Sequence, residues 1–395
     1  MFAAIGNFLY GVLAGINNLV QNYGISIILF TILIRLICLP FDYKSRKGMR
    51  KMSLIQPKLN ELQRKYGNDK QKYQQKQAEL MRKEGYNPLS SCLPLLLTWP
   101  LMIAMFSAMR SIANEQTAMQ TLRFLVDGQN AIRPEEQFLW VKNIWMTDSP
   151  FTSIAPSLKY LAESERMGLG MDVWAKAFGN LSNEEILAVV RQMGLSLDKL
   201  IVIPLDDMGN ALLNAETFFQ LPADSMLATL QEANLQLGAM ITGNSLMASG
   251  FNMTDLCAQL ALVPEYKAAI EMVGGWEDIN LWITHLSLYK NYNGLLLFPI
   301  LAGVSQILQT KLNPQMKEQQ ATQPANGQSQ GMSNFMKYFF PILSIWFCLT
   351  SNAGFSVYWV TSTVVMWVQS ILITKYLERK DAQSTEKVIG EGSIK

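Results

Sequence analysis

Residues 22–41 read NYGISIILFTILIRLICLPF, an apolar stretch of the length that crosses a membrane as one helix. About 20 helical residues span the ~30 Å hydrocarbon core of a bilayer. The stretch holds a single charged residue, Arg35, which has apolar neighbours on both sides. It predicts a transmembrane helix at 22–42 and makes Arg35 the most informative residue of the sequence.

A positive charge at position 35 of this helix has a large free-energy cost. A cation near mid-membrane costs about 2.5–3.5 kcal/mol on insertion scales, so such residues normally face a bundle interior or a water-filled cavity. Thr31 is one turn earlier on the same helical face. No obvious Asp or Glu partner appears in the apolar stretches, which favours a hydrated recess inside the bilayer. The alternative is that Arg35 extends its long side chain to the headgroups beyond Pro40.

Further apolar stretches of similar length occur along the chain. The composition agrees with a membrane protein, because 49% of the residues are hydrophobic and only 16% are charged, against about 25% charged in soluble domains. The last two stretches are separated by a few residues around Asn352 and Gly354, which predicts a tight antiparallel helical hairpin. The sequence thus predicts an all-α membrane protein with five transmembrane helices, at 22–42, 89–110, 281–311 and, as the hairpin, 335–377.

Charge segregation predicts the orientation of these helices. The segment 43–88 is strongly basic, whereas 111–280 has more Asp and Glu than Lys and Arg. Positively charged loops stay in the cytoplasm, while long loops cross a membrane largely regardless of charge. We therefore expect the N-terminus outside and the C-terminus inside. The expected cytoplasmic parts are 43–88, the loop 312–334 and the tail 378–395, and 111–280 is an extracytoplasmic insert.

Residues 1–21 are apolar but interrupted by asparagines. Phe2, Ile5, Leu9 and Val12 recur at helical spacing. A cleaved signal peptide would have a charged region at its start, and none is present. The pattern predicts an amphipathic helix lying at the membrane interface, although it lacks the usual basic face.

The basic segment 43–88 reads as a helical hairpin with a break at Gly67 and Asn68, after which Asp69 can cap the second helix. Leu54, Leu59 and Leu80 mark narrow apolar stripes on its arms. One interpretation is a solvated loop with no other task. The other is a docking surface for anionic lipid headgroups, ribosomal RNA or an acidic partner protein. The candidate docking residues are Arg46, Lys47, Arg50, Lys51, Lys58, Arg64, Lys65, Lys72, Lys76, Arg82 and Lys83.

Polar residues on the other expected spans could line the same recess as Arg35. Each of them could instead mediate helix packing, and Trp359 could make an ordinary apolar contact. The candidates are Thr98, Trp99, Ser305, Gln306, Gln309, Trp359 and Thr363, with Thr361, Ser362 and Gln369 beside them.

Three segments carry a resemblance to a known family. The segment NPLSSCLPLLLTWPLMIAMF begins at Asn87, FPILAGVSQILQTKLNP begins at Phe298, and MKYFFPILSIWFCLTSNAGFSVYWVTSTVVMWVQSILITKYL begins at Met336. In this order, after an arginine-bearing span and a charged hairpin, they resemble the YidC/Oxa1/Alb3 family of membrane protein insertases. The resemblance covers roughly residues 1–110 and 281–377.

The resemblance implies a five-helix core with a hydrophilic groove open to the cytoplasm and lipid. It implies that Arg35 is the groove arginine, with Thr31 one turn before it and Trp359 at an aromatic groove position. It also implies a chain that is not an enzyme and uses neither cofactor nor metal. The implied partners are nascent membrane proteins and membrane lipids, with the ribosome and the Sec translocon as further candidates and no DNA.

The insert at 111–280 departs from this family pattern, since a short linker is usual there. It reads as largely helical, and Ser182 with Glu185 has capping-box spacing before ILAVVRQM. A partner-binding domain and a neutral lineage insertion are both open interpretations.

Two other classes of function compete with an insertase. An enzyme finds little support, because His285 is the only histidine and no Walker-type loop appears. A solute channel or transporter would use Arg35 and the polar span residues as a solute path. Transporters commonly show paired repeats with broken helices, and the expected spans show none.

Overall fold

The computed structural model describes residues 2–67, 69–85, 88–163, 166, 168–270, 276–280, 285–289, 291–312 and 327–392. It describes the backbone alone for 2–4, 49, 52–53, 70, 88–102, 129, 276–280, 285–289, 327–337, 381 and 384–392. Five helices make up the bundle: α2 Tyr23–Tyr66, α4 Pro88–Val126, α14 Leu297–Leu312, α16 Gly327–Thr350 and α17 Ala353–Gly392. The others are α1 Phe2–Val20, α3 Lys70–Lys83, α5 Leu158–Ala162, α6 Met171–Gly179, α7 Asn183–Met193, α8 Leu197–Leu200, α9 Ala215–Phe218, α10 Ala223–Glu232, α11 Gly243–Ala248, α12 Met253–Leu260 and α13 Pro264–Ile270.

The predicted helical class is confirmed, with one exception. Trp276–Asn280 (β1) and His285–Tyr289 (β2) form an antiparallel hairpin in which Trp276 pairs with Tyr289 and Asn280 with His285. Short 3-10 helices at Gly128–Asn130, Pro134–Glu136 and Leu237–Met240 complete the described elements.

The β-hairpin corrects the helix expected at 281–311. The helix of this region, α14, begins at Leu297, because Leu296 adopts a positive φ of 63° and ends the loop that precedes it. The sequence HLSLY at 285–289 alternates polar and apolar residues, which is the period of a strand. Apolar content alone had joined this strand to the helix.

Four expected boundaries fall inside continuous helices: the expected hairpin limits, 335 and 377, lie inside α16 and α17, and the other two lie in α2 and α4. α2 runs from the first apolar stretch through Pro40 and Pro57 into the basic arm, and α4 continues sixteen residues beyond the expected end of its span, from 110 to Val126. No Gly or Pro interrupts residues 101–126. Met119, Leu122 and Leu125 then join the core of the insert, so α4 links the membrane-type helices directly to that domain.

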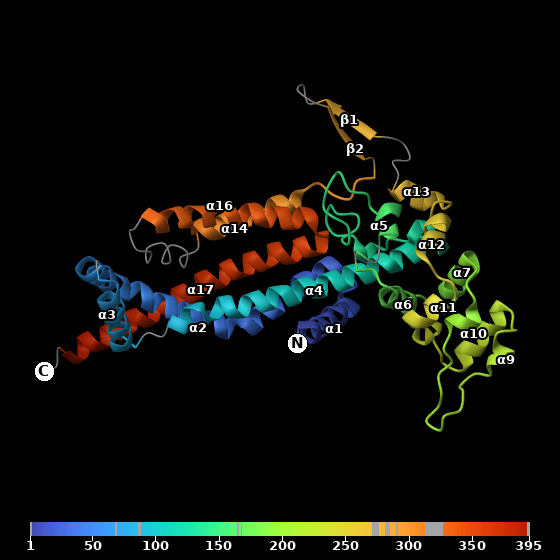
Figure 1. The fold of residues 1–395 in the computed structure, drawn as a ribbon, viewed down its shortest axis with the longest axis horizontal. Coiled ribbons are helices and arrows are strands. Elements are labelled where there is room, and N and C mark those ends of the chain that lie inside the picture. Colours follow the sequence, from blue (N-terminus) through green and yellow to red (C-terminus); the bar gives the residue numbers. More distant parts are fainter. Residues whose placement is uncertain are drawn as a thin grey trace.

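The long helices lie side by side along the long axis of the molecule (Figure 1). α2 packs extensively on α17, and it also contacts α1 and α4. α14 packs against both α16 and α17 more extensively than these two pack against each other. In the hairpin expected at 335–377, α16 and α17 are therefore joined by a short connection through Ser351 and Asn352, and α14 packs against both helices.

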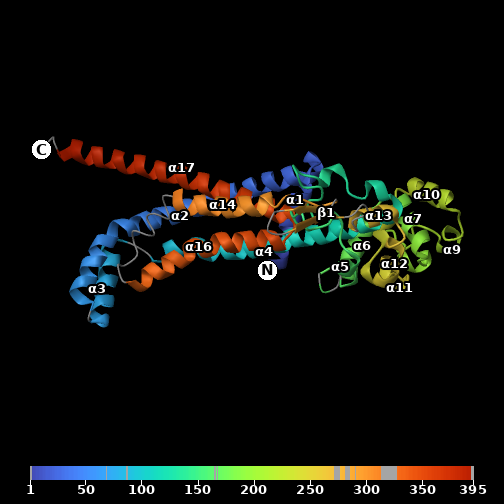
Figure 2. The same cartoon turned by 90° about the horizontal axis from the view of Figure 1, so that it is seen from above.

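The two ends of the molecule differ in kind. The insert, with α5 to α13, occupies one end, whereas α3 and the C-terminal part of α17 project from the other (Figures 1 and 2). The described residues hold two helical stretches long and apolar enough to cross a membrane, at Tyr23–Gly48 and Ala353–Lys380. The number of spans and their orientation stay predictions.

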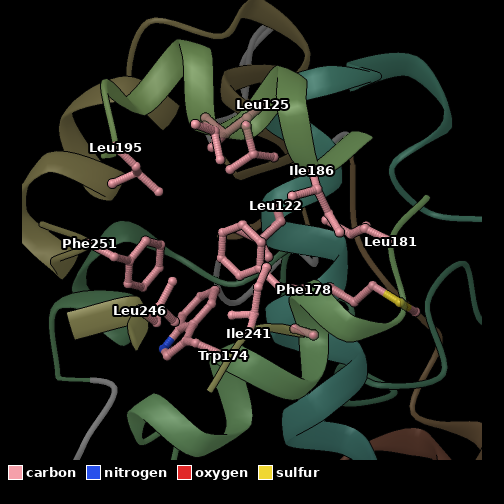
Figure 3. Packing of buried hydrophobic residues seen from close by; sticks show 14 of the residues in the cluster. Leu122, Leu125, Trp174, Phe178, Leu181, Ile186, Leu195, Ile241, Leu246 and Phe251 are labelled. Atoms are coloured by element: carbon pink, nitrogen blue, oxygen red, sulfur yellow. The ribbon is translucent and has the colours of Figure 1, made fainter. Parts of the chain in front are cut away.

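The insert has a core like that of a soluble helical domain. Trp174 and Phe178 of α6 pack with Phe251 and with Leu122 of α4 (Figure 3). The capping box expected at Ser182 is confirmed, because its hydroxyl accepts from Glu185 N at 3.2 Å and the Glu185 carboxylate accepts from Ser182 N at 2.8 Å.

The basic arm of α2 and helix α3 form the expected helical pair. The side chain of Asp69 accepts from Lys72 N at 3.1 Å and caps α3 as expected. The apolar contact is narrow, with Ile55 and Leu59 packed against Leu80 and Met81. Leu54, expected in the stripe, is 69% exposed, whereas its neighbour Ile55 is 3% exposed and takes the inward position.

Candidate functional site

Arg35 lies inside the bundle, between α2 and α17. Its residue is only 8% exposed, and its Nε donates to Ser362 Oγ at 3.0 Å, with Nη2 donating to the same oxygen. Tyr358, one turn before Ser362, lies within reach of both side chains. The acceptors that Arg35 finds among the described residues are therefore neutral hydroxyls rather than a carboxylate within ion-pair distance.

Gln369 completes what we call the seam, the set Arg35, Tyr358, Ser362 and Gln369. Its Nε2 donates to the backbone carbonyl of Arg35 at 3.1 Å, and its Oε1 is buried without a hydrogen-bond partner. Pro40 has no N–H to donate to Leu36 O, the backbone carbonyl next to that of Arg35. The seam therefore lies where the backbone ladder of α2 is already interrupted.

The polar contacts between α2 and α17 continue beyond Arg35. Arg46 donates to Ser370 Oγ, and the rings of Tyr43 and Tyr376 meet edge to face at 6.1 Å. Asp42 interacts electrostatically with both Arg35 and Arg46. Because Arg35, Asp42 and Arg46 recur at helical spacing, they share one face of α2, and Asp42 is the acidic neighbour of Arg35 that the sequence reading did not identify.

Two residues expected in the recess donate hydrogen bonds to backbone carbonyls of their own helices rather than bonding to Arg35. Thr31 is fully buried and donates to Ile27 O at 2.6 Å, and Thr363 donates to Trp359 O at 2.9 Å. Trp359 packs between Phe347 and Phe355, with its indole N–H buried and unpartnered.

The expected residues of α14 and α4 lie elsewhere. Ser305 donates to Ala302 O at 2.9 Å, and it is half-buried, as are Gln306 and Gln309. α14 contacts α17 and α16, and none of these three side chains is bonded to Arg35. Thr98 and Trp99 of α4 fall among the residues whose side chains the structure does not describe.

An apolar cleft lies beside the seam. It encloses about 460 Å³ and is open to the outside of the bundle. Gln369 belongs to both features, so a chain lying in the cleft would come close to Arg35. The lining residues are Leu36, Leu39, Pro40, Tyr43, Gln369, Leu372, Ile373 and Tyr376.

The opposite end of the bundle is closed by residues 137–148, which we call the cap. Asp148 is fully buried, and its carboxylate accepts from Leu295 N at 2.8 Å, Leu296 N at 3.2 Å and Phe298 N at 2.7 Å. The indole of Trp140 donates to it at 3.2 Å. Asp148 thus satisfies the N–H groups just before α14 and one in its first turn, where a negative charge also complements the helix dipole.

The cap also holds the starts of α2 and α17. The carbonyls of Met146 and Ile144 each accept at 2.8 Å, from Ala353 N and Gly354 N respectively. Trp145 packs edge to face on Tyr23 at 4.8 Å. One loop therefore fixes the N-termini of three long helices.

Two side-chain amides outside the cap, those of Gln120 and Asn293, form hydrogen bonds with Asn143 of the cap. Asn143 and Gln120 of α4 exchange hydrogen bonds at 2.8 and 3.3 Å. Asn293 Oδ1 accepts from Asn143 N at 2.7 Å, and its Nδ2 donates to Asn143 O at 2.9 Å. These amides are fully or almost fully buried.

Next to the cap, the pKa of the Glu136 carboxyl is raised above its usual value. Burial raises the pKa of this carboxyl to about 7, although Arg133 N donates to it at 2.8 Å. Arg123 is also buried, and its Nη1 is 3.9 Å from Glu136 Oε1. Burial lowers the pKa of Arg123, so the loss of hydration outweighs the attraction between the pair.

The candidate docking residues are mostly exposed, and several also make contacts within the protein. Some are engaged within the hairpin: Lys58 is 2.7 Å from Glu84, Lys76 is 2.7 Å from Glu79, and Lys51 donates to Gly85 O at 2.9 Å. Arg46 contacts α17, and Lys72 is 3.9 Å from Asp69. The exposed members are Lys47, Lys51, Lys58, Arg64, Lys65, Lys72, Lys76, Arg82 and Lys83, and Arg46 and Arg50 are half-buried.

The long apolar helices, the basic hairpin and a buried arginine define a polytopic helical membrane protein. The sequence profile described as "60Kd inner membrane protein" matches residues 15–190 and 261–381. The chain belongs to this family, that of the YidC/Oxa1/Alb3 insertases, and is a protein of the bacterial cell membrane. Residues 191–260, within the insert, lie outside the match.

Individual relatives agree with this family. A protein of Clostridium tetani is 31% identical over 181 residues, which are 46% of this chain and 73% of that protein. One of Fusobacterium nucleatum is 41% identical over 111 residues, or 28% and 54% of the two chains. One of Anaeromyxobacter dehalogenans is 33% identical over 150 residues, or 38% and 24%. Each is named membrane protein insertase YidC, and the chain spans less than two thirds of the latter two.

Proposed function

We propose that this protein inserts newly made membrane proteins into the bilayer, and that the seam receives the polar leading segment of the substrate. The observation that carries the proposal is Arg35, a cation buried between α2 and α17 whose acceptors are neutral hydroxyls. A charge held in this way can accept an acidic group in exchange for its hydrogen bonds to Ser362 and Tyr358.

The physical task of an insertase is to move polar groups past hydrocarbon. Transferring a hydrogen-bonding group without a partner costs several kcal/mol, about 2–7 depending on the reference state. Arg35 offers a counter-charge where the effective dielectric is lower than in water. Gln369 and Tyr358 offer further donors and acceptors on the same path.

The apolar cleft beside the seam supports the second half of the task. A substrate helix whose polar end lies at Arg35 can place apolar side chains against Leu36, Leu372 and Tyr376, which are exposed. Its release into lipid is then driven by its own apolar area, at roughly 25 cal/mol per Å². The process needs no bond to be made or broken, so the proposed function is not enzymatic.

The remaining features extend the proposal to partners and orientation. The cationic hairpin of α2 and α3 suits the cytoplasmic side, where it can meet ribosomal RNA, anionic headgroups or the Sec translocon. The insert then lies outside, with the N-terminus outside and the C-terminus inside. A solute transporter is the competing function, and it predicts flux that an insertase does not.

The test is insertion of a single-span substrate into proteoliposomes that contain only this protein. We expect insertion by the wild type, a loss of tenfold or more in Arg35→Ala, and no loss in Arg191→Ala, whose side chain is exposed on the insert. Equal insertion by Arg35→Ala and the wild type would overturn the role of the seam. Solute flux through the same vesicles without insertion would favour the transporter.

A further inference from the structure

A second cavity lies at the end of the bundle nearest the insert, apart from the seam. It encloses about 300 Å³, near the lower end of the ~300–1,000 Å³ of ligand sites. One face of α4 forms its wall, and the cap and the connection between α16 and α17 enclose it. The lining residues are Phe106, Met109, Arg110, Ala113, Asn114, Thr117, Trp145, Met146, Thr147, Tyr160, Thr350, Ser351, Asn352 and Phe355.

The polarity of this cavity changes along α4. Phe106 and Phe355 meet edge to face at 5.4 Å at the end that faces the apolar helices. Asn114 and Thr117 follow at one-turn steps toward the insert, and Arg110 lies between the two zones. An amphiphile, with an apolar and a polar end, matches this sequence of surroundings.

The charge of the lining is positive. Among the described residues that line the cavity, Arg110 is the one cation and none is acidic. Arg110 lies close enough to Tyr160 to affect its ionisation. A guanidinium binds phosphate oxygens through paired N–H groups, so the polar zone favours a phosphate-bearing ligand over a neutral one.

Trp145 supplies an independent observation. It is 3% exposed, and its indole N–H is buried without an acceptor among the described residues. Buried donors without partners are rare and call for an explanation. Since Trp145 lines this cavity, an oxygen of a bound ligand would supply such an acceptor.

The surroundings of the cavity point to lipid as the source of the ligand. Ile103 and Phe106 of α4 and Trp346 and Leu349 of α16 are exposed apolar residues near its mouth, as expected of surfaces that face acyl chains. On the insert's side, Trp145, Met146 and Thr147 of the cap close it. A headgroup with its tails leaving between α4 and α16 fits this shape, whereas a polypeptide passing through would need a second opening.

We propose that this cavity binds the phosphate headgroup of an anionic phospholipid from the leaflet on the insert's side, with Arg110 as the cation that holds it. The site is separate from Arg35 and does not depend on the insertase proposal. A bound lipid would fill the space between α4 and the α16–α17 connection and bridge them.

The experiment uses the full chain in nanodiscs of phosphatidylcholine that contain a phosphatidylglycerol with a photoreactive group near its headgroup. After irradiation, labelled peptides are identified by mass spectrometry. We expect labels at 103–117 and 350–355, reduced about tenfold or more in Arg110→Gln, since hydrogen bonds to charged groups are among the strongest. Arg379→Gln, an exposed arginine near the other end of α17, is the matched control and should label as the wild type does.

A second variant keeps the test decisive if Arg110→Gln fails to fold. Ala113→Phe fills the cavity and leaves Arg110 in place, so it should remove the same labels while thermal unfolding stays close to wild type. Unchanged labelling in both variants would overturn the proposal. Loss of labelling in the wild type on adding excess inorganic phosphate would assign the cavity to a free anion, and displacement by an acidic peptide would assign it to a polypeptide; both contradict a lipid site.

Discussion

The cap and the seam are both buried and polar, yet they are built in opposite ways. In the cap, Asp148 has four donors, and Asn143 and Asn293 exchange two hydrogen bonds. In the seam, Arg35 shares one serine hydroxyl between two of its donors, and Gln369 Oε1 has no partner. Saturated polar groups fix a structure, whereas undersaturated ones can change partners. The comparison indicates that the cap is a fixed closure and the seam a surface for exchange.

The largest predicted effect breaks the cap. Asp148→Ala leaves three backbone N–H groups and one indole N–H without their acceptor, which should lower the free energy of unfolding by about 3 kcal/mol or more. Thermal unfolding in detergent measures it. Asp206→Ala is the matched control, because Asp206 also accepts backbone N–H groups but is exposed; its loss should be about 1 kcal/mol or less. Equal losses would contradict a special role for the buried carboxylate.

The second prediction concerns pH beside the cap. The pKa of Glu136 is raised from 4.5 to about 7 by burial, so the folded protein holds this proton more tightly than the unfolded chain. Its contribution to stability is fully present below about pH 4.5 and is lost as the pH rises through about 7, an effect on the order of 2–3 kcal/mol. Unfolding temperatures measured between pH 5 and 8 test it. Glu136→Gln should flatten the profile in this window, and an unchanged slope would contradict the assignment.

The third prediction compares one amide from each region. Gln120→Leu removes the reciprocal partner of Asn143 and should cost about 2 kcal/mol. Gln369→Leu removes an amide with an already unpartnered oxygen and should cost about 1 kcal/mol or less. Chemical denaturation of the two variants, in parallel with insertion assays, gives both readouts. The comparison fails if Gln369→Leu is the more destabilising, or if it leaves insertion untouched while Gln120→Leu abolishes it.

The smallest predicted effect lies in the hairpin. Lys58 is 59% exposed where it meets Glu84, and such surface pairs are worth about 0–1 kcal/mol. Lys58→Ala should therefore change the unfolding temperature very little. Leu59→Ala, which empties part of the small apolar contact between α2 and α3, should release α3 and increase its cleavage by a protease. Greater cleavage in Lys58→Ala than in Leu59→Ala would contradict this ranking.

Much of this arrangement could be predicted because its signals are local. Arg35 is identified as a lone charge in an apolar run, and Asp69 and Ser182 are identified as helix N-caps from the residues that directly follow them. Arg35 and its partner Ser362 are 327 residues apart in the sequence, and their contact depends on how α2 and α17 pack in register. The sequence therefore names Ser362 as a candidate but does not distinguish it from its neighbours.

Other features had no local signal. In the sequence, Asp148 looks like any acidic loop residue. Its role depends on the close approach of Gly294, just before α14, where an added Cβ would lie 2.0 Å from Asp148 Oδ1. The strand at 285–289 was missed because its leucines lie close to the apolar run of α14, although the polar residues at 290–294 separate the two. Ile55, one residue from the expected Leu54, shows how a one-residue error in helical phase exchanges a buried position for an exposed one.

The central claim is that a substrate's leading segment contacts the seam, and photo-cross-linking tests it most directly. A photoreactive phenylalanine in place of Tyr358 lies beside Arg35, and the same group in place of Phe219, in the insert, is the control. With a substrate stalled during insertion, the account predicts cross-links from position 358 to the leading segment, stronger for an acidic segment than for its neutral counterpart and lost in Arg35→Ala. Cross-links that are absent at 358, or independent of both charges, would contradict it.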